Sequence, residues 1–297
     1  MSAPEGMRRI PGGAFAMGSE AFYPEEGPVR TVAVAGFWID AHPVTVRDFR
    51  RFVKSTAHIT VAERPPDPAA YPDADPALLV PGSLVFTPTG GPVALDDHRA
   101  WWRYVPGACW HRPEGPGSDT YTRGRHPVTQ VAHEDAAAYA AWAGKALPTE
   151  AEWERAARGG LDDAAYAWGD EEQPGDAPAA NTWQGEFPWR NTREDGWAGT
   201  SPVGAFPPND YGLHDVCGNV WEWTEDAWTD RHAERAPCCA PARGDGDRPR
   251  RVIKGGSHLC APSYCLRYRP AARQGEETDT STSHLGFRCV VRDADTA

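Results

Sequence analysis

The sequence predicts an α+β fold in a single domain spanning residues 1–297, with little regular secondary structure. Glycine and proline occur 30 and 29 times, well above their usual combined share of roughly 12%, so loops should form much of the fold. The helices and strands that can be recognised are all short. Thirteen tryptophans can anchor a sizeable core, and no stretch has the composition of a linker between domains.

Three short helices are predicted, and the first lies in HPVTVRDFRRFVKS. It should begin after Thr45, whose side chain can cap it, with Asp48 in the first turn. Phe49, Phe52 and Val53 then fall on one face, as expected of an amphipathic helix packed on a core.

The second helix should start near His133 and stop at Gly144. The third lies in LPTEAEWERAARGG, where Thr149 and Glu152 have the spacing of a capping box and Gly159 ends the helix. The sequence HPVT occurs before both of the first two helices, at His42 and at His126. Four residues are too few to establish an internal repeat, and chance or a shared local geometry is the favoured interpretation.

The predicted strands are short, and they cover Arg30 to Ile39, Arg251 to Lys254, and Gly286 to Val291. The proline-rich region from Ala62 to Arg125 is weakly periodic. It contains AWWRYVPGACW, and its three tryptophans indicate an ordered loop rather than a linker.

Charge and composition exclude several function classes. A net charge of −12 argues against a nucleic-acid partner and mildly favours cationic ligands, although many soluble proteins carry such a charge for solubility alone. The longest apolar stretch, Val32 to Ile39, is interrupted by Gly36 and is too short to span a bilayer. The first 13 residues lack the apolar run of a secretory signal. We therefore expect a cytoplasmic protein, and we expect its seven scattered cysteines to be free thiols.

The segment GGSHLCAPSYCLRYRP places Cys260 and Cys265 five positions apart, with Pro262 between them. On a helix they would point about 140° apart, so a loop or turn is needed to bring the sulfurs together. Zinc is disfavoured because no second pair has a suitable spacing, and Cys238 and Cys239 are adjacent. Two thiolates alone suit Cu(I), a soft ion of low coordination number. A pair of inert buried cysteines or a local disulfide remains the alternative.

Six segments resemble the formylglycine-generating enzymes, also called sulfatase-modifying factors. In chain order they are GGAFAMGS, LPTEAEWERAARGG, ANTWQGEFPWRNTREDGW, GLHDVCGNVWEWTED, KGGSHLCAPSYCLRYRPAAR and HLGFRC. The resemblance covers nearly the whole chain and implies the fold of that family, which is related to C-type lectins. Several of these segments are shared with a wider superfamily that includes iron-dependent sulfoxide synthases and non-catalytic lectin-like proteins. The cysteine segment is the specific part.

The resemblance implies an oxidase that converts the cysteine of a C-x-P-x-R motif in an unfolded sulfatase to Cα-formylglycine. Cys260 and Cys265 would bind Cu(I), the substrate cysteine would be a third thiolate ligand, molecular oxygen would be the oxidant, and an external reductant would supply further electrons. Ser257 would be a polar neighbour of the oxygen pocket. The other residues implied to line the site are Trp221, Tyr264 and Arg267. For these three, core packing or a structural ion pair is the alternative.

Two structural calcium sites are also implied by the resemblance, each built from hard oxygen ligands. The first would use the side chains of Asn181 and Asp195 with the carbonyls of Thr182 and Trp197. The second would use the side chains of Asp215 and Glu222 with the carbonyls of Gly218 and Val220. At the second site, Asp215 stands where the family pattern has an asparagine. Ordinary turns with surface acids are the alternative for both clusters.

Secreted members of the family carry structural disulfides that this chain should lack. Positions that hold disulfide-forming cysteines in those members are occupied here by Ala141, Ala157 and Pro270. Cys289 should then be a buried free thiol. His258 and Ala261 flank Cys260 where other members often carry different side chains, so substrate contacts beyond the core motif do not follow from the resemblance.

Two other functions compete with the oxidase. A lectin-like or peptide-binding module would have no use for both thiols. A non-haem iron enzyme would need a histidine set that is missing, since His126 and His133 are seven positions apart and lack the required motif.

Overall fold

The computed structural model describes residues 4–232 and 248–293, so Cys238 and Cys239 lie outside the described residues. The described chain forms the α-helices α1 (Val46–Thr56), α2 (His133–Trp142) and α3 (Glu150–Arg158). Its 3₁₀-helices are η1 (Pro24–Glu26), η2 (Val61–Glu63), η3 (Pro68–Ala70), η4 (Pro76–Leu78) and η5 (His98–Ala100). Its strands are β1 (Met7–Ile10), β2 (Gly13–Met17), β3 (Arg30–Val34), β4 (Phe37–Asp40), β5 (Gly82–Phe86), β6 (Trp102–Pro106), β7 (Gly185–Glu186), β8 (Arg190–Asn191), β9 (Trp221–Ala227), β10 (Arg250–Lys254), β11 (Arg273–Glu277), β12 (Leu285–Gly286) and β13 (Val290–Arg292).

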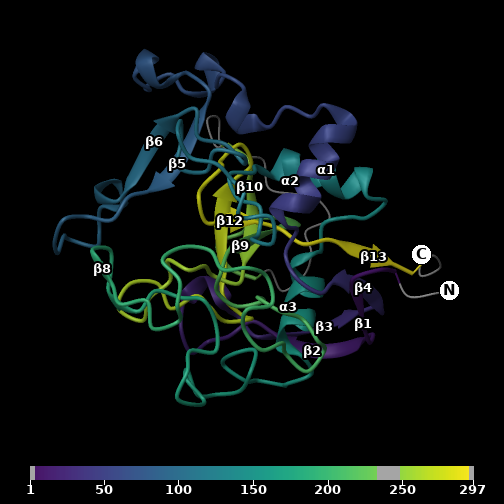
Figure 1. The fold of residues 1–297 in the computed structure, drawn as a ribbon. Helices are drawn as coiled ribbons and strands as arrows, with labels where there is room; N and C mark the ends of the chain where they lie inside the picture. Colours follow the sequence, from purple (N-terminus) through teal and green to yellow (C-terminus); the bar gives the residue numbers. More distant parts are fainter. Residues whose placement is uncertain (1–3, 233–247, 294–297) are drawn as a thin grey trace.

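Two sheets organise the fold (Figure 1). The larger has the strand order β11-β10-β9-β12, and the other, β1-β4-β13, joins the first and last described strands across β4. The pairs β2-β3, β5-β6 and β7-β8 form separate ribbons. Long loops connect these elements, which confirms the predicted α+β fold with little regular structure. Within the described residues, no helix combines the length and apolar character needed to cross a membrane.

The three predicted helices are confirmed. The Thr45 side chain accepts a hydrogen bond from the Asp48 N–H at 3.3 Å and so caps α1. Helix α3 begins with the predicted capping box, in which Glu152 N–H donates to Thr149 Oγ1 at 3.1 Å. It ends at Gly159, whose φ of 63° is left-handed. These ends were predictable because capping depends on residues close together in sequence.

The aromatic faces of α1 and α2 pack together to form one end of the main core. Phe49 stacks on Tyr139 with ring centroids 6.0 Å apart, and Phe52 meets Trp142 at 5.6 Å. The same core extends from α3 to the four-stranded sheet, because Trp153 of α3 and Trp223 of β9 are both buried in it.

Two strand predictions were wrong in extent. The expected strand Arg30 to Ile39 is divided into β3 and β4, which belong to different sheets and are separated at Ala35 and Gly36. The expected strand Gly286 to Val291 is divided in the same way into β12 and β13. An alternating pattern reports which side chains are buried, but it does not report which sheet each part of the chain joins.

The two HPVT segments lie side by side. Val46 N–H donates to the His126 carbonyl at 2.9 Å, and Val128 N–H donates to the Val44 carbonyl at 2.9 Å. Thr45 and Pro127 therefore form an antiparallel bridge. The shared sequence has a shared local geometry, because each proline segment is extended and serves as the pairing partner of the other.

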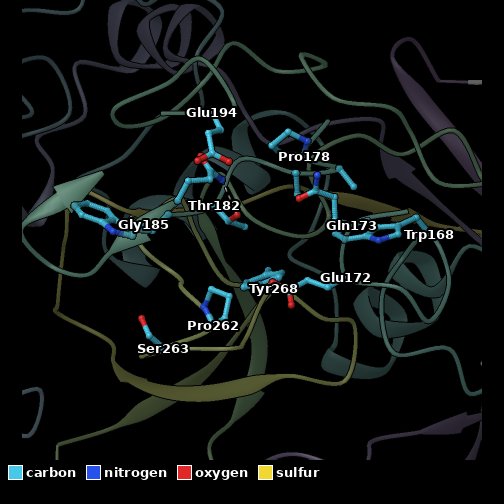
Figure 2. Close-up of a pocket in the computed structure, with 14 residues that line it drawn as sticks. Trp168, Glu172, Gln173, Pro178, Thr182, Gly185, Glu194, Pro262, Ser263 and Tyr268 are labelled. Atoms are coloured by element: carbon cyan, nitrogen blue, oxygen red, sulfur yellow. Dashed lines mark hydrogen bonds between the residues drawn. The ribbon is translucent and has the colours of Figure 1, made fainter. Parts of the chain in front are cut away.

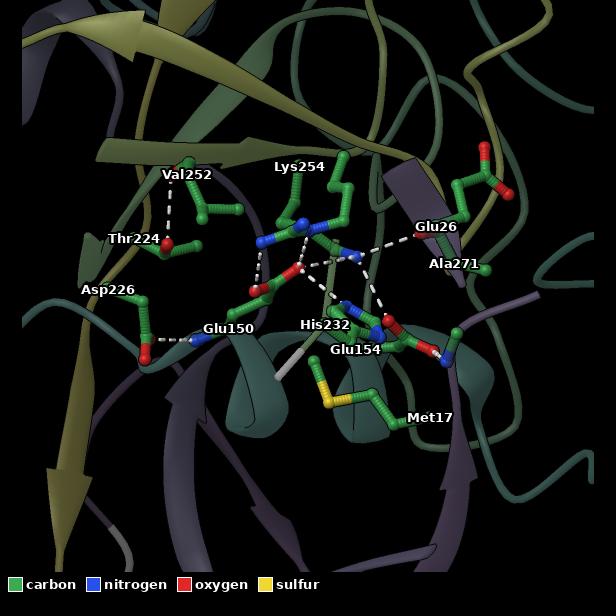
Figure 3. A network of polar contacts seen from close by, with 12 residues as sticks. Met17, Glu26, Glu150, Glu154, Thr224, Asp226, His232, Val252, Lys254 and Ala271 are labelled. Carbon is green, nitrogen blue, oxygen red and sulfur yellow. Dashed lines mark hydrogen bonds and ion pairs between the residues drawn. The ribbon is translucent and has the colours of Figure 1, made fainter. Parts of the chain in front are cut away.

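A buried charge network fixes α3 against the end of β10 (Figure 3). Lys254 Nζ lies 3.0 Å from Glu154 Oε2 and 3.7 Å from Glu150 Oε1, and its side chain is fully buried. Arg158 and Arg273 complete the network by pairing with Glu154 and Glu150. Burial opposes ionisation of Glu150, but His232, Lys254 and Arg273 outweigh it and hold its pKa below the ordinary value. The network matters for the site because Lys254 directly precedes the loop that carries the two cysteines.

Candidate active site

The structure brings Cys260 and Cys265 together. Their sulfurs are 3.1 Å apart, and both thiols are free and buried. The turn between them is closed by hydrogen bonds from the N–H groups of Tyr264 (3.0 Å) and Cys265 (2.8 Å) to the Ala261 carbonyl. This turn, which contains Pro262, supplies the reversal that the five-residue spacing requires. No disulfide joins Cys260 and Cys265 in the structure, which was one of the alternatives.

Two glycines shape the start of the cysteine loop. Gly255 and Gly256 have φ values of 93° and 68°, a left-handed conformation that other residues rarely adopt. A Cβ atom on Gly256 would lie 2.8 Å from the backbone of Arg267 and Tyr268. Only glycine permits this contact, so Gly256 lets the two ends of the cysteine loop come together.

Hydrogen bonds and charge favour one thiolate in the pair. The hydrogen bond from the Cys260 thiol, together with the charge of Arg267, lowers the pKa of Cys265. Burial raises the pKa of Cys260. The backbone N–H of Ser257 donates to Cys260 Sγ at 3.4 Å. This hydrogen bond would stabilise a thiolate at Cys260 if a bound cation replaced the proton of its thiol. The donor set is soft and compact, which fits an ion such as Cu(I).

The two cysteines line an open cavity of about 540 Å³. All four of the other side chains predicted for the site also line it: Ser257, Trp221, Tyr264 and Arg267. Trp221 is the first residue of β9, and its backbone N–H donates to the His284 carbonyl at 2.9 Å. The structure therefore brings together the six side chains predicted for the active site, while their roles in a reaction stay predictions.

Tyr264 and Arg267 are held rigidly at the cavity. The Tyr264 ring stacks on Phe187 with centroids 4.5 Å apart and meets the Trp101 ring edge-on at 5.3 Å. Arg267 donates to Glu25 Oε1 at 2.6 Å, and its guanidinium lies 3.9 Å from the centroid of the Tyr23 ring. Aromatic packing thus supports one wall of the cavity, and an ion pair fixes a positive charge beside the thiols.

Sequence reasoning missed other cavity residues. Glu276 and Gln274 reach the cavity from β11, and His284 reaches it from the segment before β12. Burial raises the pKa of Glu276 to about 7 and lowers the pKa of His284 to about 3. His284 is the first residue of the motif HLGFRC, so the sequence gave a reason to consider it for the site. Glu276 gave none, because an acid in a charged strand usually faces solvent.

The cysteine loop also borders a smaller hollow of about 290 Å³ (Figure 2). Pro262 and Ser263 line it from the tip of the turn, opposite Trp168 and Glu172. Tyr268 lines the same hollow and donates a hydrogen bond to Glu172. Neither Cys260 nor Cys265 lines this hollow, so we do not place the chemistry there.

The residues predicted for the first calcium site fit a cation. Asp195 Oδ1 accepts a hydrogen bond from Trp197 N–H at 2.9 Å, but the buried Oδ2 has no partner among the described residues. Burial raises the pKa of Asp195, and the N–H groups of Trp197 and Thr182 oppose that shift. The hydrogen bonds of the Asn181 side chain both use Nδ2, which leaves Oδ1 available to a cation. A carboxylate oxygen without a partner and an amide oxygen are both donors of the kind that Ca²⁺ prefers.

The residues predicted for the second calcium site do not fit a cation in this structure. Arg288 donates to both oxygens of Glu222 at 2.7 Å, and Trp153 Nε1 donates to Oε2 at 2.8 Å. Asp215 is also engaged, because Gly204 N–H donates to its Oδ2 at 2.8 Å. The buried guanidinium supplies the positive charge that the calcium ion would have supplied. Calcium at Asp215, Gly218, Val220 and Glu222 stays a prediction, and we derive no role for calcium there.

Fold and site together define a loop-rich α+β protein with a pair of buried thiols in an open cavity. A family model described as sulfatase-modifying factor enzyme 1-like domain matches residues 2–293. The chain belongs to this family. The formylglycine-generating enzyme of Mycobacterium tuberculosis strain H37Rv is 57% identical over 288 residues, covering 95% of this chain and 96% of the relative. Its mouse counterpart is 45% identical over 298 residues, covering 97% and 75%.

Other relatives limit what membership alone implies. A cattle protein named inactive C-alpha-formylglycine-generating enzyme 2 is 41% identical over 291 residues, covering 96% of this chain and 87% of that protein. Among solved structures, PvdO from Pseudomonas aeruginosa matches with a TM-score of 0.62 and 25% identity, covering 96% of this chain and 93% of PvdO. The same fold therefore occurs in proteins with different names, and the site must decide the function.

Proposed function

We propose that this protein is a formylglycine-generating oxidase, which converts the cysteine of a C-x-P-x-R motif in sulfatases to Cα-formylglycine with Cu(I) and molecular oxygen. The observation that carries the proposal is the pair of free, buried sulfurs 3.1 Å apart on the wall of an open cavity. The family supports the reaction, because close relatives bear the name formylglycine-generating enzyme.

In this proposal Cys260 and Cys265 hold Cu(I), which would supply electron transfer to oxygen when bound. The chain's own contribution is to lower the pKa of Cys265 and to aim both sulfurs at one point. The hydrogen bond from Cys260 and the charge of Arg267 lower the pKa of Cys265, and the Ser257 N–H, 3.4 Å from Cys260 Sγ, would stabilise a second thiolate when a cation is bound. Trp221, which is 2% exposed, shields that point from one side, and the stacked Tyr264 shields it from another.

The substrate would enter as an extended segment through the open side of the cavity. Because both sulfurs are buried, the substrate cysteine must reach them on a flexible segment, which an unfolded sulfatase chain provides. Oxidation of the cysteine to a thioaldehyde releases two electrons, and hydrolysis of the thioaldehyde gives the aldehyde and hydrogen sulfide. Reduction of oxygen to water takes four electrons. An external reductant must therefore supply the other two in each cycle.

A binding module without chemistry is the second candidate, and the relative named as inactive gives it some support. It would leave the thiol pair without a purpose, because a peptide groove gains nothing from two buried sulfurs at 3.1 Å. The two candidates differ in whether the thiol of the substrate peptide is needed.

Two peptides that differ only in the motif cysteine test the proposal. The cysteine peptide should tighten Cu(I) binding and be oxidised, whereas its serine analogue should do neither, since a hydroxyl is a hard and weak ligand for Cu(I). Competition against a Cu(I) chelator measures the first effect and mass spectrometry the second. Equal binding of both peptides with no conversion would favour the binding module.

We also propose that calcium at Asn181, Thr182, Asp195 and Trp197 supports the active site. Next to this cluster, Trp183 N–H donates to the Cys260 carbonyl at 2.9 Å. Removing the ion would leave Asp195 Oδ2 buried without a partner, which costs about 1–3 kcal/mol. Loss of the ion should also make the cysteine loop less ordered.

Chelation of calcium should lower the melting temperature of the parent protein by several degrees. Asp195→Ala should melt low with and without calcium. Glu194→Ala is the matched control, because Glu194 is the neighbouring acid and is exposed, and it should keep the calcium response of the parent. If Asp195→Ala responded to calcium like the parent, the site would be wrongly assigned.

We place the protein in the cytoplasm, where a reducing environment would keep both copper ligands available. This placement is supported by the five described cysteines, all of which are free. Cys289 is fully buried, as expected where its disulfide partners are missing.

A further inference from the structure

Three side chains outside the active-site cavity converge on one point. They are Glu63, Cys109 and His111, and their ligand atoms all lie within 4.8 Å of one another. Cys109 Sγ is 3.4 Å from His111 Nδ1, and that nitrogen is 3.8 Å from Glu63 Oε1. The second distance is too long for a hydrogen bond. Both distances are close to the edges of a tetrahedron of zinc ligands, which measure about 3.3–3.8 Å for the usual metal–ligand bond lengths.

We propose that Glu63, Cys109 and His111 form a zinc-binding site with an open fourth position. A thiolate, an imidazole and a carboxylate are the three ligand types that Zn²⁺ takes from proteins, and three protein ligands leave one position for water or an anion. With Cys109 and Glu63 ionised and His111 neutral, the ligands balance the charge of the ion. The site uses none of the residues assigned to copper or calcium.

The ligands are held in place by the protein itself. Cys109 and Arg112 exchange two backbone hydrogen bonds, of 3.1 and 2.9 Å, which close a tight turn at Trp110 and His111. The Trp110 ring anchors this turn in the main core against Phe49, with centroids 5.4 Å apart. The turn brings Cys109 and His111 to the same point although only one residue separates them.

Glu63 is oriented from the other side. Thr60 donates to Glu63 Oε2 through its N–H at 3.1 Å and its hydroxyl at 2.6 Å. Both hydrogen bonds use Oε2, so Oε1 stays available and faces His111. A carboxylate fixed through one oxygen while the other meets the metal is the usual second-shell arrangement.

The fourth position opens toward a hollow of about 760 Å³ that Glu63 and His111 help to line. Arg50 and Arg112 line the same hollow and favour an anion as the fourth ligand. Trp110 also lines it, and its buried indole N–H has no hydrogen-bond partner among the described residues. That N–H is a donor ready for a water or small anion on the ion.

The test uses the full chain with Cys260→Ser and Cys265→Ser, so that the active-site thiols cannot bind the probe. Titration with Co²⁺ should show one equivalent bound, with the sulfur-to-cobalt charge-transfer band of a thiolate ligand and the visible bands of a tetrahedral ion. Zn²⁺ should displace it. Adding Cys109→Ala should abolish the charge-transfer band, and adding His111→Ala should weaken binding at least about tenfold.

Cys217→Ala in the same background is the matched control, because Cys217 is another buried free thiol, and it should bind Co²⁺ like the background protein. His111 is partly exposed, with 37% of its side chain accessible, so its variant should fold even if Cys109→Ala does not. Unchanged binding by His111→Ala would overturn the proposal. So would a background protein that bound neither Co²⁺ nor Zn²⁺ at micromolar concentration, or one that bound Cu(I) there and rejected both divalent ions.

Discussion

Replacement of either Cys260 or Cys265 by serine is expected to reduce formylglycine formation by about a thousandfold or more, as is usual for residues that act as one catalytic unit. The two sulfurs face each other at 3.1 Å, so a single remaining thiol would leave one soft ligand beside a hydroxyl. The double variant should then be little worse than either single variant. Turnover on a C-x-P-x-R peptide, with copper supplied and oxygen present, measures this effect.

Cys217→Ser is the matched control for the loss of a buried thiol. Cys217 is 2% exposed, belongs to the main core and lies outside the set of cavity-lining residues. Its variant should keep substantial turnover once its stability is accounted for. Robust turnover by Cys260→Ser or by Cys265→Ser would contradict the assignment of the pair.

Replacement of Lys254 by methionine is expected to cost about 3–5 kcal/mol of unfolding free energy, the range seen when one partner of a buried ion pair is removed. Lys254 is fully buried between Glu154 at 3.0 Å and Glu150 at 3.7 Å. Without it, Arg158 and Arg273 remain as the nearby guanidinium partners of these carboxylates. Because most domains are stable by only about 5–15 kcal/mol, the variant should unfold at a markedly lower denaturant concentration.

Arg250→Met provides the comparison within β10. Arg250 is on the same strand but is exposed, and its distance of 4.0 Å from Asp230 makes that ion pair weak. Its variant should change the unfolding free energy by no more than about 0.5 kcal/mol. If Lys254→Met unfolded at the same denaturant concentration as Arg250→Met, the network would not have the structural role described here.

Local signals account for what the sequence could predict of the fold. Thr149 and Glu152 meet across one helical turn, and Gly159 adopts a left-handed conformation one residue past the end of α3, so both ends of that helix could be read from neighbouring residues. The division of Arg30 to Ile39 into β3 and β4 could not, because it depends on which distant strands, β2 and β1, pair with each half. The hairpin of β5 and β6 escaped prediction because the proline-rich sequence around it is only weakly periodic.

The active site was predictable to the extent that its chemistry is concentrated in one segment. Cys260 and Cys265 stand five positions apart, so their spacing alone predicted a turn, while Cu(I) remains a prediction from the softness of two thiolates and from the resemblance. The role of Arg288 at Glu222 was not accessible, because those residues lie in different motifs and meet only in the folded core. The cluster of Glu63 with Cys109 was hidden for the same reason, since the two side chains come from segments far apart in sequence.

We expect the thiol pair and copper together to oxidise a peptide cysteine. The measurement that tests it most directly is the mass of a C-x-P-x-R peptide after incubation under oxygen, with a thiol reductant, with copper-loaded or copper-free protein. Conversion of the cysteine to the aldehyde is expected with the copper-loaded protein and none with the copper-free protein. Equal conversion by both forms, or an unchanged peptide with fully loaded protein, would contradict it.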